Sequence, residues 1–333
     1  MAKQRLIFIL YNLIVVGGIM CLLELTFQYL ISHPAKIPKA FLAPFQHYYS
    51  YNFRNTIQMD TTCARYDSGL FYTLKPGLCR FNNVEFKTDL TINNIGTRDS
   101  EDATHDPEII FLGDSFTMGW GTPDDSCFAS FVKRATPHKT LNAGISSYGT
   151  AREIKLLNRL DTDSLKTLVI QYHNNDFEEN REYVNGPFNL KISSEDAYLN
   201  FTEKVKKRSA YYFGKHCANL AYNTLKLITG HYDNYKFNPK EVRDFISVLE
   251  HSAVPLDNVQ IIFFETCSYN NYISKFSDEL ESEIQNKTHP DYIRKIKIIK
   301  LGGILTDNDY YILDDHIKPS GHKKIADKLL QII

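Results

Sequence analysis

The sequence lacks a strong net charge and contains little tryptophan, cysteine or methionine. Its 333 residues hold 38 Lys and Arg against 39 Asp and Glu, with one Trp, six Cys and four Met. A nearly neutral chain has no overall attraction to nucleic acid or to an acidic partner, which disfavours those classes of protein. No internal repeat or low-complexity tract interrupts it, and its length suffices for one sizeable domain with additional segments.

Charge is also absent between Leu6 and Leu23, directly after the basic residues Lys3 and Arg5. This run approaches the roughly 20 apolar residues that cross a bilayer, and it is long for the core of a signal peptide. No small-x-small cleavage pattern follows it. We therefore expect residues 1–31 to form an uncleaved signal anchor and transmembrane helix, with a cleaved signal peptide as the alternative. The preceding basic residues favour an extracytoplasmic main domain, in the periplasm or on the outer face of the membrane.

The cysteines leave the disulfide pattern open. Cys63 and Cys79 are close enough in the sequence to staple one loop, and Cys217 with Cys267 would form a second bridge. This pairing leaves Cys127 alone, because five cysteines outside the apolar run cannot all pair within one chain. Buried thiols are the alternative to each of these bridges.

The rest of the chain is expected to have two parts. Residues 32–106 are rich in Tyr, Phe, Asn and Thr, and the alternating stretches 84–87 and 90–92 indicate strands or extended segments. We expect a membrane-proximal region here that packs on the main domain. Residues 107–333 show short apolar runs alternating with helical patterns, and a helical, loop-rich insertion interrupts them around residues 177–238.

The alternation in the main domain predicts its architecture. Strands are expected at residues 108–112, 139–143, 166–172, 259–264 and 293–301. Helices are expected at residues 127–134, 151–160, 239–251 and 321–333. This order predicts an α/β fold, a three-layer α/β/α sandwich around a five-stranded, flavodoxin-like parallel sheet. Ligands bind at the carboxyl ends of the strands in such sheets, so the chemistry is expected there.

Four of the expected strand ends carry a reactive or hydrogen-bonding group. They are Gly113-Asp114-Ser115, Asn142-Ala143-Gly144, His173-Asn174-Asn175 and, after the last strand, Asp314-Asp315-His316. Because these ends meet at one edge of the sheet, Ser115 and His316 can meet despite their separation in the sequence. A histidine can activate a serine by taking its proton, and a carboxylate can orient the imidazole.

The order of these blocks, Gly-Asp-Ser, Gly, Asn-Asp and Asp/His, resembles the SGNH hydrolases, also called GDSL-like esterases, over residues 108–333. Three longer strings resemble a membrane-associated branch that includes enzymes acting on acylated cell-surface polysaccharides. They are Asn94–Asp99, Gly113–Gly121 and Asn142–Gly149. The resemblance implies that Ser115 is the nucleophile and His316 the general base. It also implies an oxyanion hole formed by the Ser115 N–H, the Gly144 N–H and the Asn175 side chain.

The sequence departs from the family pattern at two positions. The family often has Gly two residues before the Asn of its third block, and His173 stands there, where it could reshape the acyl side of the pocket. The family usually has Asp three residues before the histidine, and Leu313 stands there. We therefore expect Asp314 to orient His316, with Asp315 as the alternative. Asp114 is expected either to cap a turn or to support the site.

The resemblance implies a serine esterase that removes acyl groups, acetyl foremost, from an extracytoplasmic carbohydrate or lipid. The alternatives are an O-acyltransferase with the same triad, acting on a cell-surface polysaccharide, and a catalytically silent polysaccharide-binding protein. No cofactor, metal or nucleic-acid partner is expected. Asp176 with residues 314–316 could imitate a metal site, but no short His/carboxylate pair lies on a helix face. Thr117 occupies the last Gly position of Gly-x-Ser-x-Gly, which argues against an α/β-hydrolase elbow.

Overall fold

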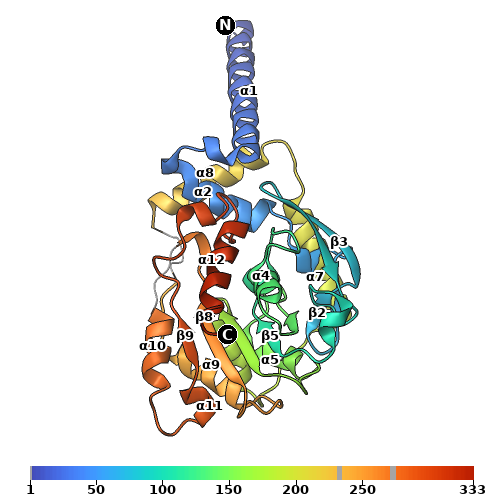
Figure 1. The fold of residues 1–333 in the computed structure, drawn as a ribbon. Helices are drawn as coiled ribbons and strands as arrows, with labels where there is room; N and C mark the ends of the chain where they lie inside the picture. The colour runs from blue at the N-terminus through green and yellow to red at the C-terminus, as the bar shows by residue number, and fades with distance from the viewer. Residues whose placement is uncertain (1, 231–234, 271–274) are drawn as a thin grey trace. The chain divides into compact units, whose positions relative to one another are not determined.

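The computed structural model describes residues 2–230, 235–270 and 275–333 (Figure 1). Contacts group the chain into two compact units. Unit 1 comprises Met1–Arg54, Lys206–Asn234 and Ile312–Asp314, and unit 2 comprises Asn55–Val205, Tyr235–Tyr311 and Asp315–Ile333. Residues 55–106 share the unit of the sheet, and residues 206–234 of the expected insertion share the unit of the N-terminal helix.

Unit 2 contains the expected five-stranded parallel sheet, in the order β6-β5-β7-β8-β9. Its strands are β5 (Ile109–Leu112), β6 (Thr140–Asn142), β7 (Thr167–Tyr172), β8 (Gln260–Glu265) and β9 (Lys297–Ile299). The order confirms the flavodoxin-like α/β fold. The expected strand 293–301 is too long, because Asp291–Arg294 forms the helical turn α11 before β9.

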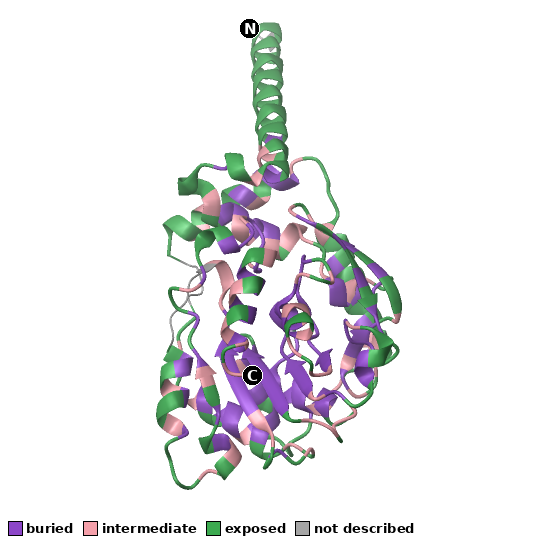
Figure 2. Cartoon of the chain, in the orientation of Figure 1, coloured by how far each residue is buried: buried purple, intermediate pink, exposed green. Residues whose placement is uncertain are grey.

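Helices cover both faces of the sheet. One face packs against α5 (Thr150–Leu157) and α9 (Lys240–Glu250), and the other against α4 (Phe128–Ala135) and α12 (Pro319–Leu329). Neighbouring residues of β5 enter two different apolar clusters, as the alternation of side chains along a strand requires. Strands β5, β6 and β7 are buried throughout, and β8 is buried beyond its first residue (Figure 2), which explains why they appear as continuous apolar runs in the sequence.

Two antiparallel hairpins precede the sheet in unit 2. Strand β1 (Ala64–Asp67) pairs with β2 (Phe71–Leu74), and β3 (Gly77–Asn82) pairs with β4 (Lys87–Ile92). The stretch 90–92 is a strand as expected. The stretch 84–87 is not, because all but its last residue forms the turn between β3 and β4.

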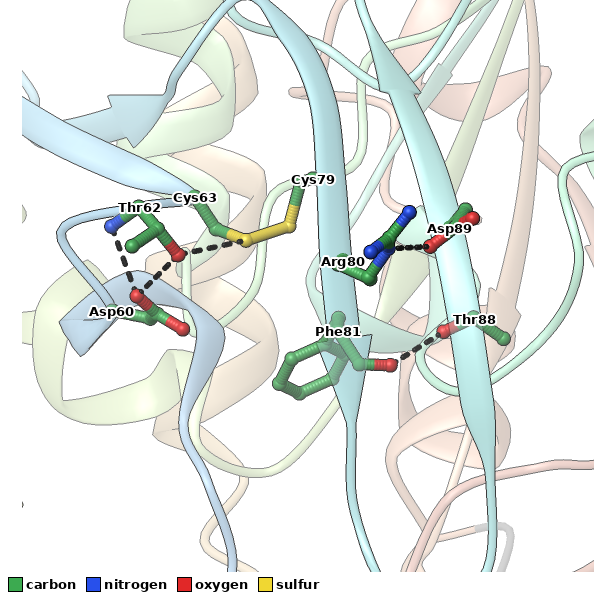
Figure 3. The surroundings of a disulfide bond; sticks show 8 residues. All are labelled: Asp60, Thr62, Cys63, Cys79, Arg80, Phe81, Thr88 and Asp89. Carbon is green, nitrogen blue, oxygen red and sulfur yellow. Dashed lines mark hydrogen bonds and ion pairs between the residues drawn. A yellow bond between two sulfur atoms is a disulfide. The ribbon is translucent and has the colours of Figure 1, made fainter.

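The cysteine predictions are half correct. Cys63 and Cys79 form a disulfide that ties the start of β1 to β3 (Figure 3). The second expected bridge is wrong, since Cys217 and Cys267 are not disulfide-bonded. The Cys267 thiol instead lies 3.6 Å from the Tyr310 hydroxyl. Proximity in the sequence therefore identified the short loop, whereas the longer pairing had no physical constraint behind it.

The insertion is helical, as expected. It contains α6 (Asp176–Asn185), α7 (Glu195–Ser209) and α8 (Lys215–Ile228), of which α8 belongs to unit 1. A further helix of unit 2, α10 (Lys275–Glu283), follows β8. The four basic side chains of the run Lys204–Arg208 are exposed on the last turn of α7, which confirms that this run is a solvated helix face.

Unit 1 is built from α1 (Ala2–Ser32), α2 (Leu42–Tyr48), the π-helical turn Tyr49–Phe53 and α8. The segment Lys3–Ser32 is long and apolar enough to cross a membrane by its length and composition. None of the residues in the most apolar part of this segment is buried. The predicted N-terminal apolar helix is confirmed; a signal anchor and a signal sequence share these properties.

Candidate active site

Ser115 stands at the carboxyl end of β5, on a turn that its neighbours hold in place. Gly113 has a φ of 153°, and a Cβ there would lie 2.1 Å from Thr117 Oγ1, which leaves room only for glycine. Asp114 accepts a hydrogen bond from the Phe116 N–H at 2.9 Å and caps the short helix α3 (Ser115–Met118). The capping role expected for Asp114 is therefore confirmed, and Ser115 becomes the first residue of this helix.

The structure brings Ser115 and His316 together. His316 Nε2 lies 2.7 Å from Ser115 Oγ, although 201 positions separate the two residues. His316 stands on the loop between β9 and α12. There the Tyr311 N–H donates to the His316 carbonyl at 3.1 Å, and a β-bridge joins Tyr310 to Ile317. A serine hydroxyl that donates to Nε2 is placed to lose its proton to the imidazole.

The two carboxylates before His316 have different surroundings. Asp315 Oδ1 lies 3.2 Å from His316 Nδ1, on the side of the ring opposite Ser115. Asp314 belongs to unit 1 and is buried, and the Tyr49 hydroxyl donates to its Oδ2 at 3.4 Å. The contact at Nδ1 puts Asp315, the alternative of the sequence analysis, where a carboxylate that orients the imidazole would lie.

Two aromatic rings enclose the imidazole of His316. Trp120 stacks on it with centroids 4.6 Å apart and planes 13° apart, and Phe116 lies with its centroid at 4.9 Å. Trp120 packs in turn against Phe81 of β3, at 4.6 Å. The hairpin β3–β4 thus supports the predicted base, and the face of an indole ring favours a cation beside it. The sequence analysis missed both rings, although the chain has one Trp and it lies in the serine block.

A row of polar side chains runs from Asp315 to the predicted oxyanion donor Asn175. The Ser268 hydroxyl donates to Asp315 Oδ2 at 3.0 Å and lies 3.4 Å from His173 Nε2. On the other side of the ring, His173 Nδ1 lies 2.8 Å from Asn175 Oδ1. An N–H at Nδ1 would donate to this oxygen, which leaves the amide nitrogen of Asn175 to donate elsewhere. The Asn175 backbone N–H lies 3.4 Å from the same Nδ1, which accepts it in the other tautomer, so either tautomer joins His173, where the family often has Gly, to Asn175.

The structure gives Gly144 a packing role. A Cβ at this position would lie 2.3 Å from the Met118 nitrogen, so the loop after β6 approaches α3 too closely for any side chain. The Gly144 N–H donates to Asn142 Oδ1 at 3.0 Å. An oxyanion would have to share this N–H with Asn142, and the oxyanion role of Gly144 stays a prediction.

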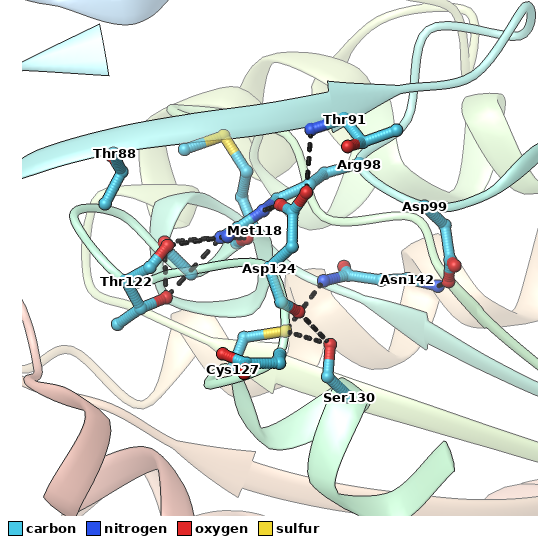
Figure 4. Close-up of polar contacts among 12 residues, drawn as sticks. Thr88, Thr91, Arg98, Asp99, Met118, Thr122, Asp124, Cys127, Ser130 and Asn142 are labelled. Atoms are coloured by element: carbon cyan, nitrogen blue, oxygen red, sulfur yellow. Dashed lines mark hydrogen bonds and ion pairs between the residues drawn. The ribbon is translucent and has the colours of Figure 1, made fainter. Parts of the chain in front are cut away.

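Arg98 and Asp99 of the string Asn94–Asp99 hydrogen-bond to the loop after α3 and to the end of β6 (Figure 4). The buried Arg98 guanidinium donates to the carbonyls of Met118, Gly119 and Thr122 at 2.8, 2.7 and 2.6 Å and pairs with Asp124 at 2.8 Å. Asp99 Oδ2 accepts a hydrogen bond from the Asn142 N–H at 3.0 Å. Arg98 and Asp99 therefore fix the loop after β5 and the end of β6 relative to each other.

Three buried carboxyl groups lie near the site residues in the sequence. Burial raises the pKa of Asp114, and it raises the pKa of Glu153 and Asp176 well above the usual range, with repulsion between the last two adding to the effect on Glu153. Asp176 Oδ2 accepts a hydrogen bond from the Thr150 hydroxyl at 2.9 Å. Asp176 thus has a hydrogen-bond partner inside the fold.

Comparison with known proteins gives distant structural likenesses. No protein-family model and no curated protein matches the chain. The chain is similar to a member of the lipolytic G-D-S-L family from Veillonella parvula, at 11% identity and a TM-score of 0.37, over 68% of this chain and 97% of that one.

Two further solved structures are similar at the same level. An acetyl xylan esterase from the rumen bacterium Butyrivibrio proteoclasticus matches at 13% identity and a TM-score of 0.33, over 67% of this chain and 62% of that one. A salicylyl-acyltransferase from a tetracycline biosynthetic pathway matches at 12% identity and a TM-score of 0.37, over 71% and 57%. The chain spans less than two thirds of either protein. Likenesses this distant carry no argument about activity, which has to rest on the side chains themselves.

Proposed function

We propose that this chain is a serine ester hydrolase of the SGNH type, with Ser115 as nucleophile and His316 as general base. The observation that carries the proposal is the 2.7 Å contact between Ser115 Oγ and His316 Nε2 at the carboxyl edge of the sheet. The Asp315 carboxylate at His316 Nδ1 completes a Ser-His-Asp row. These three residues catalyse ester hydrolysis when water is the final acceptor of the acyl group.

The geometry supports a two-step mechanism. Ser115 Oγ attacks the ester carbonyl carbon while its proton passes to His316 Nε2, and Asp315 and the Trp120 ring stabilise the imidazolium. The imidazolium then gives its proton to the departing alkoxide, which leaves an acylated Ser115. A water molecule loses a proton to His316 and attacks the acyl carbon; the bond to Ser115 Oγ then breaks, and His316 returns the proton to Oγ as the acid is released.

The negative charge of each tetrahedral intermediate falls on the former carbonyl oxygen. The Ser115 N–H is available because the first N–H groups of a helix have no intrahelical acceptor. The Asn175 amide, which His173 orients, and the Gly144 N–H complete the proposed oxyanion hole. One such donor typically contributes roughly 3–4 kcal/mol of transition-state stabilisation.

We propose that α1 remains attached as a membrane anchor and holds the catalytic domain outside the cytoplasm. The last turns of α1 are part of the folded unit 1. Glu24 is 1% exposed and accepts hydrogen bonds from the N–H groups of His216 and Cys217 at 3.2 and 2.9 Å, and Gln28 Oε1 lies 2.6 Å from His216 Nε2. Cleavage after α1 would remove these partners. The motif resemblance supports an acylated carbohydrate or lipid as substrate, with acetyl as the acyl group.

A fluorophosphonate probe tests for the activated serine. The full chain in detergent would be labelled beside Ser115→Ala, His316→Ala and the control Ser126→Ala, whose hydroxyl bonds Asp125 outside the site. We expect labelling of the wild type and the control, and its loss in the other two variants. Hydrolysis of p-nitrophenyl acetate, with and without sugar acceptors, would then separate hydrolysis from acyl transfer. A folded wild type that neither reacts nor hydrolyses would refute the proposal.

A further inference from the structure

Helix α8 of unit 1 turns an apolar stripe outward. Ala218, Ala221, Tyr222, Leu225 and Ile228 recur at helical spacing, which puts them on one face. All five are exposed, Leu225 to 59% and Ile228 to 77%. A surface helix of a water-soluble domain turns such a stripe toward the core. The exposed stripe therefore needs an apolar partner in place of water.

Polar side chains near the start of α8 point into unit 1. The Lys215 ammonium is buried and donates to the carbonyls of Asn52, Arg208 and Ala210 at 2.9, 2.7 and 2.9 Å. His216 is fully buried, with Tyr48 Oη 2.8 Å from Nδ1 and Gln28 Oε1 2.6 Å from Nε2. Because these bonds fix the rotation of α8 about its axis, the apolar stripe cannot turn inward without breaking them.

The start of α8 is tied to α1. The Glu24 carboxylate accepts the first N–H groups of α8, at His216 and Cys217, and also the Tyr211 hydroxyl at 3.1 Å. A carboxylate at a helix N-terminus is favoured by the helix dipole as well as by these bonds. Since Glu24 directly follows the uncharged run Leu6–Leu23, α8 starts at the level where that run would leave the bilayer.

An apolar cavity of about 870 Å³ lies among these helices. Its lining includes Leu23 and Phe27 of α1, Phe41 and Phe45 at α2, and Leu225 and Ile228 of the exposed stripe. Ligand pockets have volumes of roughly 300–1,000 Å³. The cavity offers almost no hydrogen-bonding group, so its chemistry suits hydrocarbon chains.

The charge of unit 1 indicates the sign of the headgroup. The ranges that form unit 1 hold ten Lys and Arg against three Asp and Glu, whereas the whole chain has a net charge of −1. The two acidic residues of unit 1 that the structure describes, Glu24 and Asp314, are buried at 1% and 0% exposure. Exposed basic side chains include Lys36, Lys39, Lys206, Lys207 and Arg208. Such a surface attracts anionic phosphates.

We propose that unit 1 binds anionic phospholipids of the bilayer that holds α1. The acyl chains occupy the apolar cavity and cover the stripe of α8, and the phosphates pair with the exposed lysines and arginine. This inference rests on the membrane anchoring in the proposed function and is independent of the ester chemistry. It makes α8 a second contact with the membrane beside α1.

Tryptophan quenching in lipid nanodiscs tests the inference on the full chain. The fluorescence quenching of Ile228→Trp would be compared with that of the wild type and of Leu13→Trp. The one Trp of the wild type is buried in unit 2 and gives the minimum quenching, and Leu13→Trp in α1 gives the maximum. The discs contain equal parts of phosphatidylglycerol and phosphatidylcholine, with bromine on one lipid or the other. We expect strong quenching of Ile228→Trp, about twofold stronger with bromine on phosphatidylglycerol. Leu225→Trp provides a second site in case the first variant folds poorly.

The other outcomes separate the possible failures. Quenching of Leu13→Trp but of neither Leu225→Trp nor Ile228→Trp would overturn the inference and leave the membrane anchor in place. Lack of quenching at all three sites would refute the anchor itself. Equal quenching by the two lipids would refute the preference for anionic lipid. The substitutions Lys206→Gln, Lys207→Gln and Arg208→Gln, added to Ile228→Trp, should remove the twofold preference for phosphatidylglycerol. Added to Leu13→Trp, they should leave its quenching unchanged.

Discussion

Both units bury apolar clusters, but they differ in the apolar surface that they expose. Unit 2 packs apolar clusters on both faces of its sheet and gathers polar groups at the strand ends, around Ser115 and His316. Unit 1 buries Glu24, Lys215 and His216 and exposes the apolar stripe of α8. The proposed lipid contact of unit 1 would account for this difference. Apolar surface is buried where water surrounds the fold and is left outside where lipid is expected.

The largest expected effect is a loss of activity in unit 2, on substitution of a carboxylate before His316. Asp315→Asn removes the charge at His316 Nδ1 and should lower kcat for p-nitrophenyl acetate by roughly 10³–10⁴-fold. Asp314→Asn is the matched neighbour; it should change thermal stability more than kcat, because Asp314 bonds Tyr49 within unit 1. The reverse ranking of the two kcat values would return the orienting role to Asp314.

A smaller loss of activity is expected at the oxyanion hole. Asn175→Ala should lower kcat by roughly 10²–10³-fold with little change in KM, since the oxyanion exists only along the reaction path. His173→Gly restores the residue that the family often has and removes the partner of Asn175 Oδ1, and should cost roughly tenfold in kcat. His173→Gln, which can still donate to that oxygen, should recover part of the loss. Equal kcat values for His173→Gly and the wild type would refute the positioning role.

In unit 1 the expected effect is on stability. Glu24→Ala leaves the first N–H groups of α8 without their acceptor and should lower the free energy of unfolding of this unit by roughly 1–3 kcal/mol. The measurement is thermal unfolding in detergent, with protection of the Lys215 peptide bond from trypsin as a local readout. Thr26→Ala, on the same helix with an exposed hydroxyl, is the control. Probe labelling of Ser115 should be unchanged, and equal stability of the two variants would contradict this account of α8.

The smallest effect concerns the buried carboxyl of Glu153. Neither of its oxygens has a hydrogen-bond partner among the described residues, and burial raises its pKa well above the ordinary 4.5. A raised pKa means that the folded state holds a proton that the unfolded chain releases. The contribution to stability is therefore full below pH 4.5 and falls as the pH rises toward the folded pKa. Glu153→Gln should flatten the decline in Tm between about pH 5 and 8; identical slopes would contradict the assignment.

Much of unit 2 could be predicted from the sequence. Buried parallel strands appear as short apolar runs, and strand ends share one edge, so the meeting of Ser115 and His316 followed from topology. Contacts between loops could not be predicted, because spacing does not describe the path of a loop. The stacking of Trp120 on His316 and the row from Ser268 to Asn175 therefore came only from the structure. Spacing also could not choose between Asp314 and Asp315, which differ by one position in the same loop.

Unit 1 was harder to anticipate for a different reason. A pattern of apolar and polar residues predicts which face of a helix is buried when water is the solvent, whereas α8 turns its apolar stripe outward. The apolar segment of α1 was recognised from its length and its lack of charge between Leu6 and Leu23. The partnership of Glu24 with α8 joins residues about 190 positions apart, and no local pattern marks it.

The most direct test of the central claim is the capture of an acyl group on Ser115. The full chain would be mixed with p-nitrophenyl acetate, quenched in acid within the first turnover, digested and analysed by mass spectrometry. The account predicts one added acetyl group on the peptide that contains Ser115, and none on that peptide in His316→Ala. An active wild type whose acetyl group is found on another residue, or on none, would contradict it.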